Sequence, residues 1–258
     1  MNMLTFFSIS LKAILLVLRA LFKIYYFLFF VITLIISYPF MYYFLKKTKR
    51  FPKAFCLMRI HAFLLLLFAG VFLKVKGADN IPKNGSYIIC PNHSSFLDIF
   101  CLYRIFRQYF VFTGKKEIER WPLFHIYYTS GMNILIDRNS PTGSIHAQKR
   151  MLHEIDNKNP LVIFPEGTIS KLAPVMAPFK TGAFAIAIQK KIPIVPVTFV
   201  NNWKLLQRTG IWKGRAGPGI SKVIIHQPIN TTELCKADTE RLKKMVEETI
   251  SNSLNIKN

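Results

Sequence analysis

The pattern of apolar and polar residues divides the chain into two regions, and the first is almost continuously apolar. Within residues 4–23 the few polar side chains, among them Lys12, Arg19 and Lys23, recur at helical spacing and fall on one narrow face. An apolar helix with such a basic stripe is typical of segments that lie in the surface of a bilayer. The pattern therefore predicts an amphipathic, membrane-associated helix at the start of the chain.

A run of 22 uncharged residues follows at 24–45, and a membrane span needs about 20 residues. Five basic residues at 46–53 come next, and basic clusters beside a span usually stay in the cytoplasm. The later apolar run at 62–73 is too short to cross, and a two-span hairpin would place the basic cluster outside. Two arrangements remain: one span with the N-terminus outside, or a pair of helices embedded from the cytoplasmic side. Either predicts the inner (cytoplasmic) membrane, with the rest of the chain on its cytoplasmic side.

From Lys76 onward, short apolar runs alternate with helical patterns. Strands are predicted at 87–90, 109–112, 134–136, 161–164, 194–200 and 223–225. Helices are predicted at 94–107, 144–157, 183–190 and 237–254. This alternation predicts an α/β fold: a mostly parallel central sheet flanked by helices and preceded by N-terminal membrane-embedded helices. We divide the chain into a membrane anchor, residues 1–75, and a catalytic domain, residues 76–258.

Composition and charge narrow the function classes. The chain is 51% hydrophobic, which excludes a disordered protein, and its polar second half excludes a multi-span transporter. Its 35 Lys and Arg against 13 Asp and Glu give a net charge of +22, and residues 1–78 hold eleven basic residues and no acidic one. Because the basic residues of this segment flank apolar runs, we expect a bilayer with anionic lipids as partner. The second half has no nucleic-acid-binding motif, so no nucleic acid is expected.

A histidine and an aspartate follow the first of these strands, in Asn-His-Ser-Ser-Phe-Leu-Asp at 92–98. On one regular helix they would point apart, so they pair only if His93 lies in the loop and Asp98 in the first helical turn, capped by Asn92 or Ser94. Asp98 would then fix the tautomer of His93 and leave its other nitrogen as a base. Because no serine or cysteine nucleophile motif accompanies them, the base would act on a substrate hydroxyl. The spacing alone also fits a loop histidine beside a capping aspartate.

Two further motifs follow later strands. Glu166, Gly167 and Thr168 stand after a predicted strand, where Glu166 is a carboxylate at the sheet edge and Gly167 lets the backbone approach a ligand. Arg138 follows another strand, and its guanidinium has the geometry to bind a phosphate. Ligands of parallel sheets bind beyond the carboxyl ends of the strands, where both motifs lie. Taken singly, each motif also fits an ordinary turn.

A further motif, Ile-Pro-Ile-Val-Pro-Val, follows at 192–197. In this order the motifs resemble those of the 1-acylglycerol-3-phosphate O-acyltransferases (lysophosphatidic acid acyltransferases), a family of the glycerolipid acyltransferase superfamily. The resemblance covers residues 75–230 and rests most on the histidine–aspartate block and on Phe-Pro-Glu-Gly-Thr at 164–168. It implies that His93 takes the proton of a lysophospholipid acceptor, oriented by Asp98, and that the acceptor oxygen attacks the thioester of acyl carrier protein (acyl-ACP) or of acyl-CoA. The implied reaction acylates the sn-2 hydroxyl of 1-acyl-sn-glycerol 3-phosphate to phosphatidic acid, in phospholipid biosynthesis.

The resemblance also implies a binding site. It assigns phosphate contact to Arg138 and glycerol-side contact to Glu166 and Gly167, and a backbone N–H near Gly167 is expected to stabilise the oxyanion. The substrate-binding residues that it implies are Lys116, Arg138, Glu166, Gly167, Thr168, Lys171 and Lys180.

One position departs from the family pattern. The family usually continues Glu-Gly-Thr with an arginine that helps to bind the acceptor phosphate, whereas this chain has Ile169, which cannot bind an anion. Either Lys171 or Lys180 takes over, or the acceptor is not a phosphate monoester. The second case leaves an alternative function, O-acylation of a lyso-aminolipid such as a lyso-ornithine or lyso-glycine lipid. We favour the phosphate acceptor because Arg138 and several lysines remain.

A non-enzymatic function is the third alternative: a lipid-binding or scaffold protein that uses only its basic N-terminal region. It predicts that His93 and Glu166 are dispensable. The other histidines lack metal-ligand spacing, and no glycine-rich nucleotide loop is present, so neither a metal nor a cofactor is expected.

Overall fold

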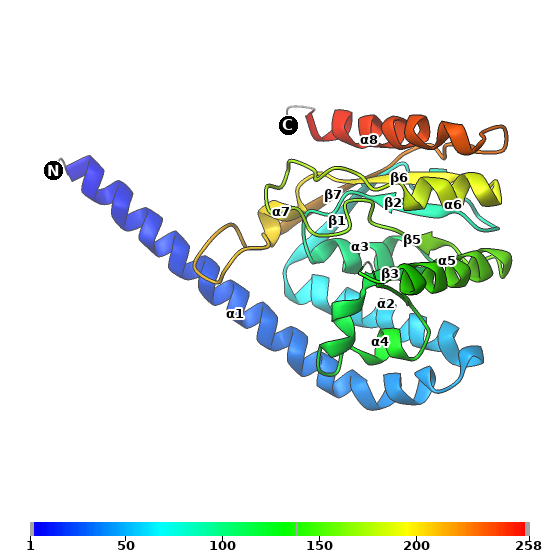
Figure 1. Cartoon of the computed structure of the whole chain (residues 1–258). Coiled ribbons are helices and arrows are strands. Elements are labelled where there is room, and N and C mark those ends of the chain that lie inside the picture. Colours follow the sequence, from blue (N-terminus) through cyan, green and yellow to red (C-terminus); the bar gives the residue numbers. More distant parts are fainter. Residues whose placement is uncertain (1–2, 138, 256–258) are drawn as a thin grey trace.

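The structure is a computed structural model that describes residues 3–137 and 139–255 (Figure 1). Its centre is a seven-stranded sheet in the order β1-β7-β6-β2-β5-β3-β4, in which β6 and β7 are antiparallel and all other neighbours parallel. The predicted mostly parallel α/β fold is therefore confirmed. The strands are β1 Val71–Lys76, β2 Ile88–Pro91, β3 Val111–Lys115, β4 Ile134–Ile136, β5 Leu161–Val162, β6 Ile194–Phe199 and β7 Gly219–Ile225.

Strand β1 was not predicted. It pairs in parallel with β7 along its whole length and crosses the expected boundary between residues 75 and 76. Its apolar residues Val71, Leu73 and Val75 alternate with exposed ones, the pattern of a strand with one buried face. Because a long apolar helix precedes β1 directly, the sequence does not distinguish this alternation from the apolar run of the helix.

Helices cover both faces of the sheet. One face carries α2 Phe51–Phe68, α3 Leu97–Ile105 and α4 Ile126–Thr129, and the other carries α5 Pro141–Asp156, α6 Gly182–Lys190 and α8 Thr239–Asn255. Successive residues of β2 point to opposite faces, since Ile89 belongs to the first core while Ile88 and Cys90 belong to the second. The central strands are buried on both faces, which explains their unbroken apolar sequence.

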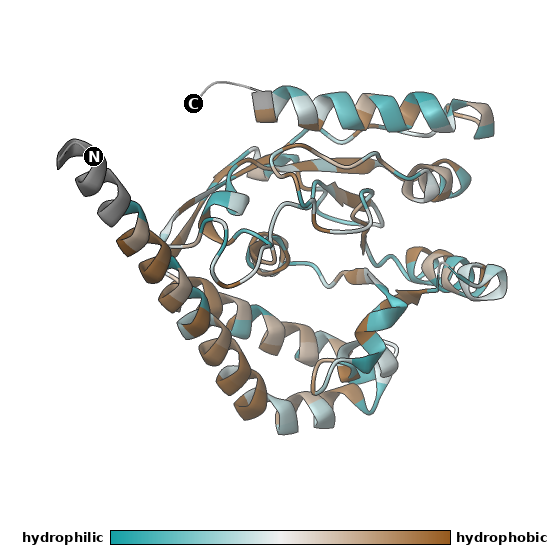
Figure 2. Ribbon diagram, turned by 60° about the vertical axis from the view of Figure 1, so that its left-hand side comes forward, coloured by the Kyte–Doolittle hydropathy of each residue, from teal (hydrophilic) through white to brown (hydrophobic). Residues whose placement is uncertain are grey.

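The first helix, α1 Met3–Leu45, is continuous over 43 residues, about 65 Å. It joins the predicted surface helix and the predicted span, although the side chains before Lys12 lie outside the described residues. Large apolar side chains such as Phe27 and Ile36 are more than 60% exposed. Figure 2 shows the coloured part of this helix as predominantly apolar, and Figure 1 shows that the helix extends beyond the sheet.

Two helical segments, Lys12–Leu45 and Thr48–Phe68, are long and apolar enough to cross a membrane. The prediction that the second apolar run is too short was therefore wrong, because it counted only 62–73 and the helix starts earlier. This helix nevertheless belongs to the domain core. Arg59 Nε donates to Tyr103 O at 3.1 Å, and the rings of Phe55 and Phe110 meet edge to face at 4.9 Å. α2 thus ties the long apolar helix to the sheet.

Candidate active site

The polar motifs gather at one edge of the sheet. Strands β2, β5, β3 and β4 are adjacent and parallel, so their carboxyl ends lie side by side at intervals of about 4.8 Å. His93 follows β2, Glu166 follows β5, Lys116 follows β3 and Asp137 follows β4. Residues up to 73 positions apart in the sequence therefore meet at this edge.

His93 and Asp98 form the predicted pair. His93 Nδ1 lies 3.0 Å from Asp98 Oδ2, with His93 9% exposed and Asp98 fully buried. Because the carboxylate accepts from Nδ1, the other ring nitrogen, Nε2, carries the lone pair. Among the described residues Nε2 has no hydrogen-bond partner. The imidazole is thus oriented on one side and open on the other.

Asp98 organises the whole loop rather than one ring. Its Oδ2 also accepts from the backbone N–H groups of Ser94 and Ser95, at 2.7 and 2.8 Å, and its Oδ1 accepts from Asn202 Nδ2 at 2.8 Å. These bonds keep 94–96 out of the helix, so α3 begins at Leu97 and not at the predicted residue 94. A buried carboxylate with this many donors has one permitted orientation.

Neither predicted helix cap is present. The residue before α3 is Phe96, whose side chain makes no cap, and it is Ser95 Oγ that accepts from Leu97 N, at 3.2 Å. Asn92 instead joins the loop to β6: its Nδ2 donates to Phe199 O at 3.2 Å, and its Oδ1 accepts from Phe199 N at 2.7 Å. Asn92 therefore fixes the loop to a neighbouring strand and does not cap α3.

One aromatic ring supports the imidazole. Phe164 stacks on His93 with ring centres 3.9 Å apart and planes inclined by 21°. Phe164 was predicted to end a strand, whereas β5 stops at Val162 and the ring turns to the site. Together with Asp98, this stacking restricts His93 to one rotamer.

Glu166 holds two backbone segments together. Its Oε1 accepts from His93 N at 2.6 Å and its Oε2 accepts from Ala177 N at 2.8 Å, and the residue is only 4% exposed. Glu166 therefore braces the loop that carries the imidazole. Its contact with the glycerol side of a substrate stays a prediction.

Burial raises the pKa of Glu166 to about 7 from 4.5, although two backbone N–H groups that favour the charged form oppose the shift. The folded protein then binds one more proton than the unfolded chain between pH 4.5 and 7. The resulting stabilisation is complete below pH 4.5 and is lost as the pH rises through 7, with at most about 3 kcal/mol at stake. We expect the free energy of unfolding of the wild type to fall over this range, relative to Glu166→Gln.

Infrared spectroscopy tests this expectation directly. The difference spectrum of wild type minus Glu166→Gln should contain a protonated-carboxyl C=O band that disappears with a midpoint near pH 7. Asp238→Asn serves as the control, because the hydrogen bond from the Cys235 backbone N–H lowers the pKa of Asp238, and its difference spectrum should lack such a band at pH 6. Loss of the Glu166 band already at pH 5 would contradict the raised pKa.

The turn after Glu166 is tight. Gly167 has a φ of +70°, which favours glycine, and its N–H donates to Phe164 O at 2.9 Å. This N–H is therefore engaged within the turn, and an oxyanion donor near Gly167 stays a prediction. Thr168 Oγ1 accepts from Arg208 Nη1 at 2.9 Å. The turn also reaches His93 directly, because Ser170 N donates to His93 O at 2.9 Å.

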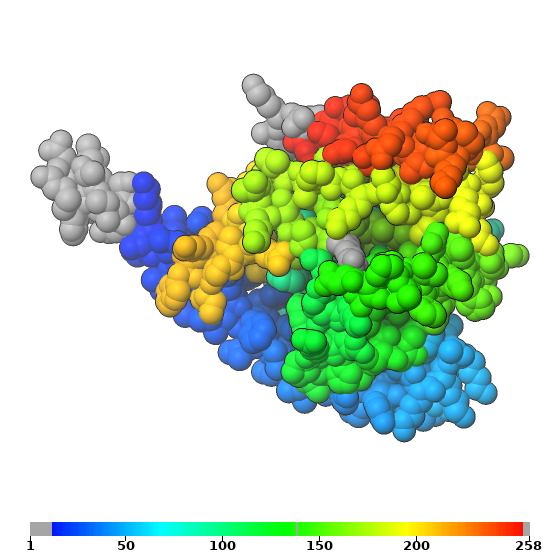
Figure 3. Space-filling model, viewed as in Figure 1, coloured from blue at the N-terminus to red at the C-terminus, as the bar shows by residue number. Residues whose placement is uncertain are grey.

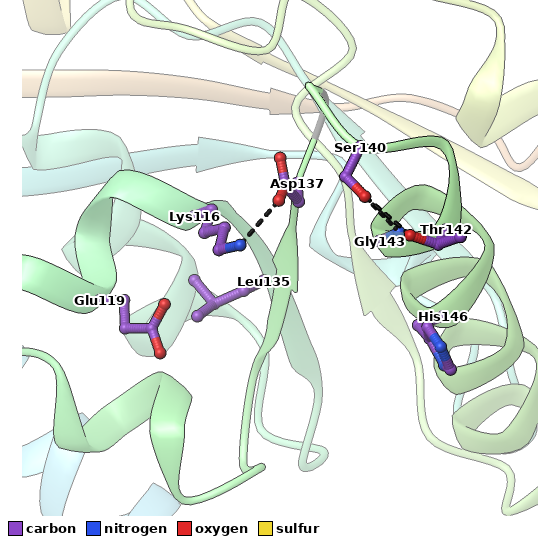
Figure 4. A pocket seen from close by; sticks show the side chains of 8 residues that line it. All are labelled: Lys116, Glu119, Leu135, Asp137, Ser140, Thr142, Gly143 and His146. Carbon is purple, nitrogen blue, oxygen red and sulfur yellow. Dashed lines mark hydrogen bonds and ion pairs between the residues drawn. The ribbon is translucent and has the colours of Figure 1, made fainter.

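Lys116 lines an open cavity of about 320 Å³ further along the same edge (Figure 4). Its Nζ donates to Asp137 Oδ2 at 2.7 Å, and this hydrogen bond raises the pKa of Lys116. His146 lies on the opposite wall, on α5. The cavity is two strand positions from His93, so the His93–Asp98 pair and this cavity are neighbouring parts of one edge.

Three predicted binding residues remain: Arg138, Lys171 and Lys180. Arg138 lies outside the described residues. Lys171 and Lys180 are exposed, and the backbone N–H of Lys180 donates to Pro165 O at 2.9 Å. Substrate contact by any of these side chains stays a prediction.

Two residues of the site have no signal in the sequence. Asn202, which orients Asp98, and Arg208, which contacts Thr168, both follow β6 and lie 104 and 40 positions from their partners. Asn202 is itself oriented, because its Oδ1 accepts from Ser221 Oγ at 2.6 Å. Only the pairing of β6 with its neighbours brings these residues to the edge.

Comparisons with known proteins agree with this geometry. The family model described as "Acyltransferase" matches residues 72–200. The 1-acyl-sn-glycerol-3-phosphate acyltransferases of Saccharomyces cerevisiae and Limnanthes douglasii are 36% and 32% identical over 176 and 186 residues, or 67% and 72% of this chain. This chain spans 56% and 64% of the length of those two relatives.

A solved structure shares the fold. The crystal structure of the 1-acyl-sn-glycerophosphate acyltransferase from Thermotoga maritima superposes with a TM-score of 0.76 at 20% identity, covering 92% of this chain and 95% of that one. The family model and the relatives confirm the resemblance inferred from the motifs, and the solved structure agrees in fold.

Proposed function

The chain belongs to the acyltransferase family, and we propose that it transfers a fatty acyl group from a thioester to the sn-2 hydroxyl of 1-acyl-sn-glycerol 3-phosphate, giving phosphatidic acid. One observation carries the proposal: a buried, doubly oriented imidazole whose Nε2 is open at the carboxyl edge of the sheet. A base in that place suits a substrate hydroxyl. The relatives' names supply the acceptor.

The reaction follows from the geometry of His93. Nε2 of His93 takes the proton of the sn-2 hydroxyl while the hydroxyl oxygen attacks the carbonyl carbon of the thioester. The Asp98 carboxylate stabilises the imidazolium that forms. Collapse of the tetrahedral intermediate breaks the C–S bond. The imidazolium returns its proton to the departing sulfur, so the products are the ester and the free thiol. Base catalysis contributes about 10²–10⁴-fold, and positioning of the two substrates supplies the rest.

The donor and the membrane are parts of the same proposal. The thioester is that of acyl carrier protein or of coenzyme A, and both lipid chains reach the site from a bilayer with anionic lipids. The exposed apolar surface of α1 and the basic residues of 1–78 support such an attachment. We place the protein in the inner membrane, with residues 76–258 on the cytoplasmic side as the catalytic unit.

A panel of acceptors tests the function. Purified full-length protein in lipid vesicles is given an acyl thioester and either lysophosphatidic acid, a lyso-ornithine lipid or a lyso-glycine lipid. We expect turnover with lysophosphatidic acid, measured as phosphatidic acid by mass spectrometry. Turnover of an aminolipid alone would establish the alternative acceptor, and no turnover of any acceptor would favour the non-enzymatic function.

A further inference from the structure

A loop between α7 Asn202–Leu205 and β7 lies beside the site. Residues 206–216, which we name the 206–216 loop, close on themselves where Leu206 bridges Ala216 and Gln207 N donates to Arg215 O at 2.9 Å. The loop lies against α1, as Figure 3 shows in orange and blue, and Lys23 of that helix donates to its backbone. It therefore links the membrane-facing helix to the sheet edge.

The loop that carries His93 and the turn that follows Glu166 both contact the base of the 206–216 loop. On one side Ser95 Oγ donates to Leu206 O at 2.7 Å. On the other side Arg208 Nη1 donates to Thr168 Oγ1 at 2.9 Å and to Ile169 O at 3.1 Å. The next residue of that turn, Ser170, donates to the backbone O of His93, so the turn connects Arg208 to the loop that carries the imidazole.

The charge of Arg208 is not neutralised. Both oxygens that it contacts are uncharged, and among the described residues it forms no ion pair. Its Nε and Nη2 have no protein partner in the described part of the chain, so these N–H donors of an exposed side chain are available to a ligand. A guanidinium fixed in this way binds a phosphate in a fork geometry.

Lys116, another cation at this edge, is less suited to this role. Lys116 is already paired with Asp137 at 2.7 Å. Ile169, next to the Glu-Gly-Thr turn, is apolar and only 5% exposed, so it adds no charge. Arg208 brings a positive charge to the same turn from a different element.

We propose that Arg208 binds the phosphate of the lysolipid acceptor, an inference that rests on the proposed function. The phosphorus of 1-acyl-sn-glycerol 3-phosphate is only a few bonds from the reacting hydroxyl. A cation bound to the turn that contacts His93 is therefore placed to bind that phosphate. The phosphates of the acyl donor are separated from the thioester by the whole pantetheine arm, which is too long for this position.

The test is the kinetics of Arg208→Gln in the full-length protein. The glutamine amide keeps a donor for Thr168 and Ile169 but has no charge. We expect the KM for lysophosphatidic acid to rise about 10- to 100-fold, the usual cost of losing hydrogen bonds to a charged group, while kcat and the KM for the acyl thioester stay at wild-type values. Arg208→Lys should recover part of the loss.

Lys213→Gln is the matched control, because it removes one charge from the same loop and the side chain contacts neither Thr168 nor Ile169. Its KM values should equal those of the wild type. An unchanged acceptor KM in Arg208→Gln, or a rise in the donor KM instead, would overturn the inference while leaving the proposed function intact. Failure of the wild type to acylate lysophosphatidic acid would overturn both.

Discussion

Replacing His93 by alanine should lower kcat for lysophosphatidic acid acylation by about 10²- to 10⁴-fold or more, because the substrate hydroxyl loses its base. No other titratable group in the described chain contacts the His93 ring except Asp98, which is fully buried behind it. The acceptor KM should change little, since the imidazole acts on the proton in the transition state. Steady-state kinetics of the purified full-length protein measure both constants.

The substitution also leaves a gap beside the Phe164 ring, which lies 3.9 Å from the His93 ring. Added imidazole should enter this gap and restore part of kcat, whereas a purely structural role for His93 predicts no rescue. His153→Gln, on the exposed face of α5, serves as the control and should keep full activity. Wild-type turnover by His93→Ala would rule out the mechanism.

The sequence was sufficient for the parts of the fold that depend on local pattern. Strands such as β4 Ile134–Ile136 and helices such as α6 Gly182–Lys190 agree with the predicted ranges to within a residue, because their apolar periodicity reports burial directly. The pairing of His93 with Asp98 also agrees with the prediction that His93 lies in the loop and Asp98 in the first helical turn. Such inferences need no knowledge of distant segments.

The details of the site could not be predicted because they depend on long-range pairing. The competition of Asp98 for the N–H groups of Ser94 and Ser95 delays the start of α3, whereas helix periodicity favours an earlier start. The orientation of Asp98 by Asn202 exists only because β6 lies next to β2 in the sheet. Neither the motif spacing nor the composition of the chain predicts that β6 and β2 are neighbours in the sheet.

Glu166 illustrates the same limit. A carboxylate after a strand fits a substrate ligand and fits a brace for the backbone equally well. Here its two oxygens accept from His93 N and Ala177 N, so the brace is the role that the geometry supports. The motif therefore predicts that Glu166 lies at the candidate site beside His93, as the structure shows, but it does not predict which groups its carboxylate contacts.

Asp98→Asn should lower kcat by about 10²- to 10⁴-fold with a much smaller change in the acceptor KM. The site requires an acceptor on both carboxyl oxygens, since Oδ2 faces His93 Nδ1 and Oδ1 faces Asn202 Nδ2. An asparagine supplies an acceptor on one side only. Either His93 loses the partner that fixes its tautomer, or two donors face each other, which costs about 1–3 kcal/mol of folding free energy. Kinetics and thermal unfolding separate the two effects.

The double variant decides whether Asp98 acts through His93. If the aspartate only orients the imidazole, then adding Asp98→Asn to His93→Ala should leave the residual kcat unchanged, because residues that act as a unit are not additive. Asp156→Asn, an exposed carboxylate paired with Lys190, controls for the loss of a charge and should behave as wild type. A further drop in kcat in the double variant, with unchanged thermal stability, would mean that Asp98 acts on the substrate independently of the imidazole that it contacts.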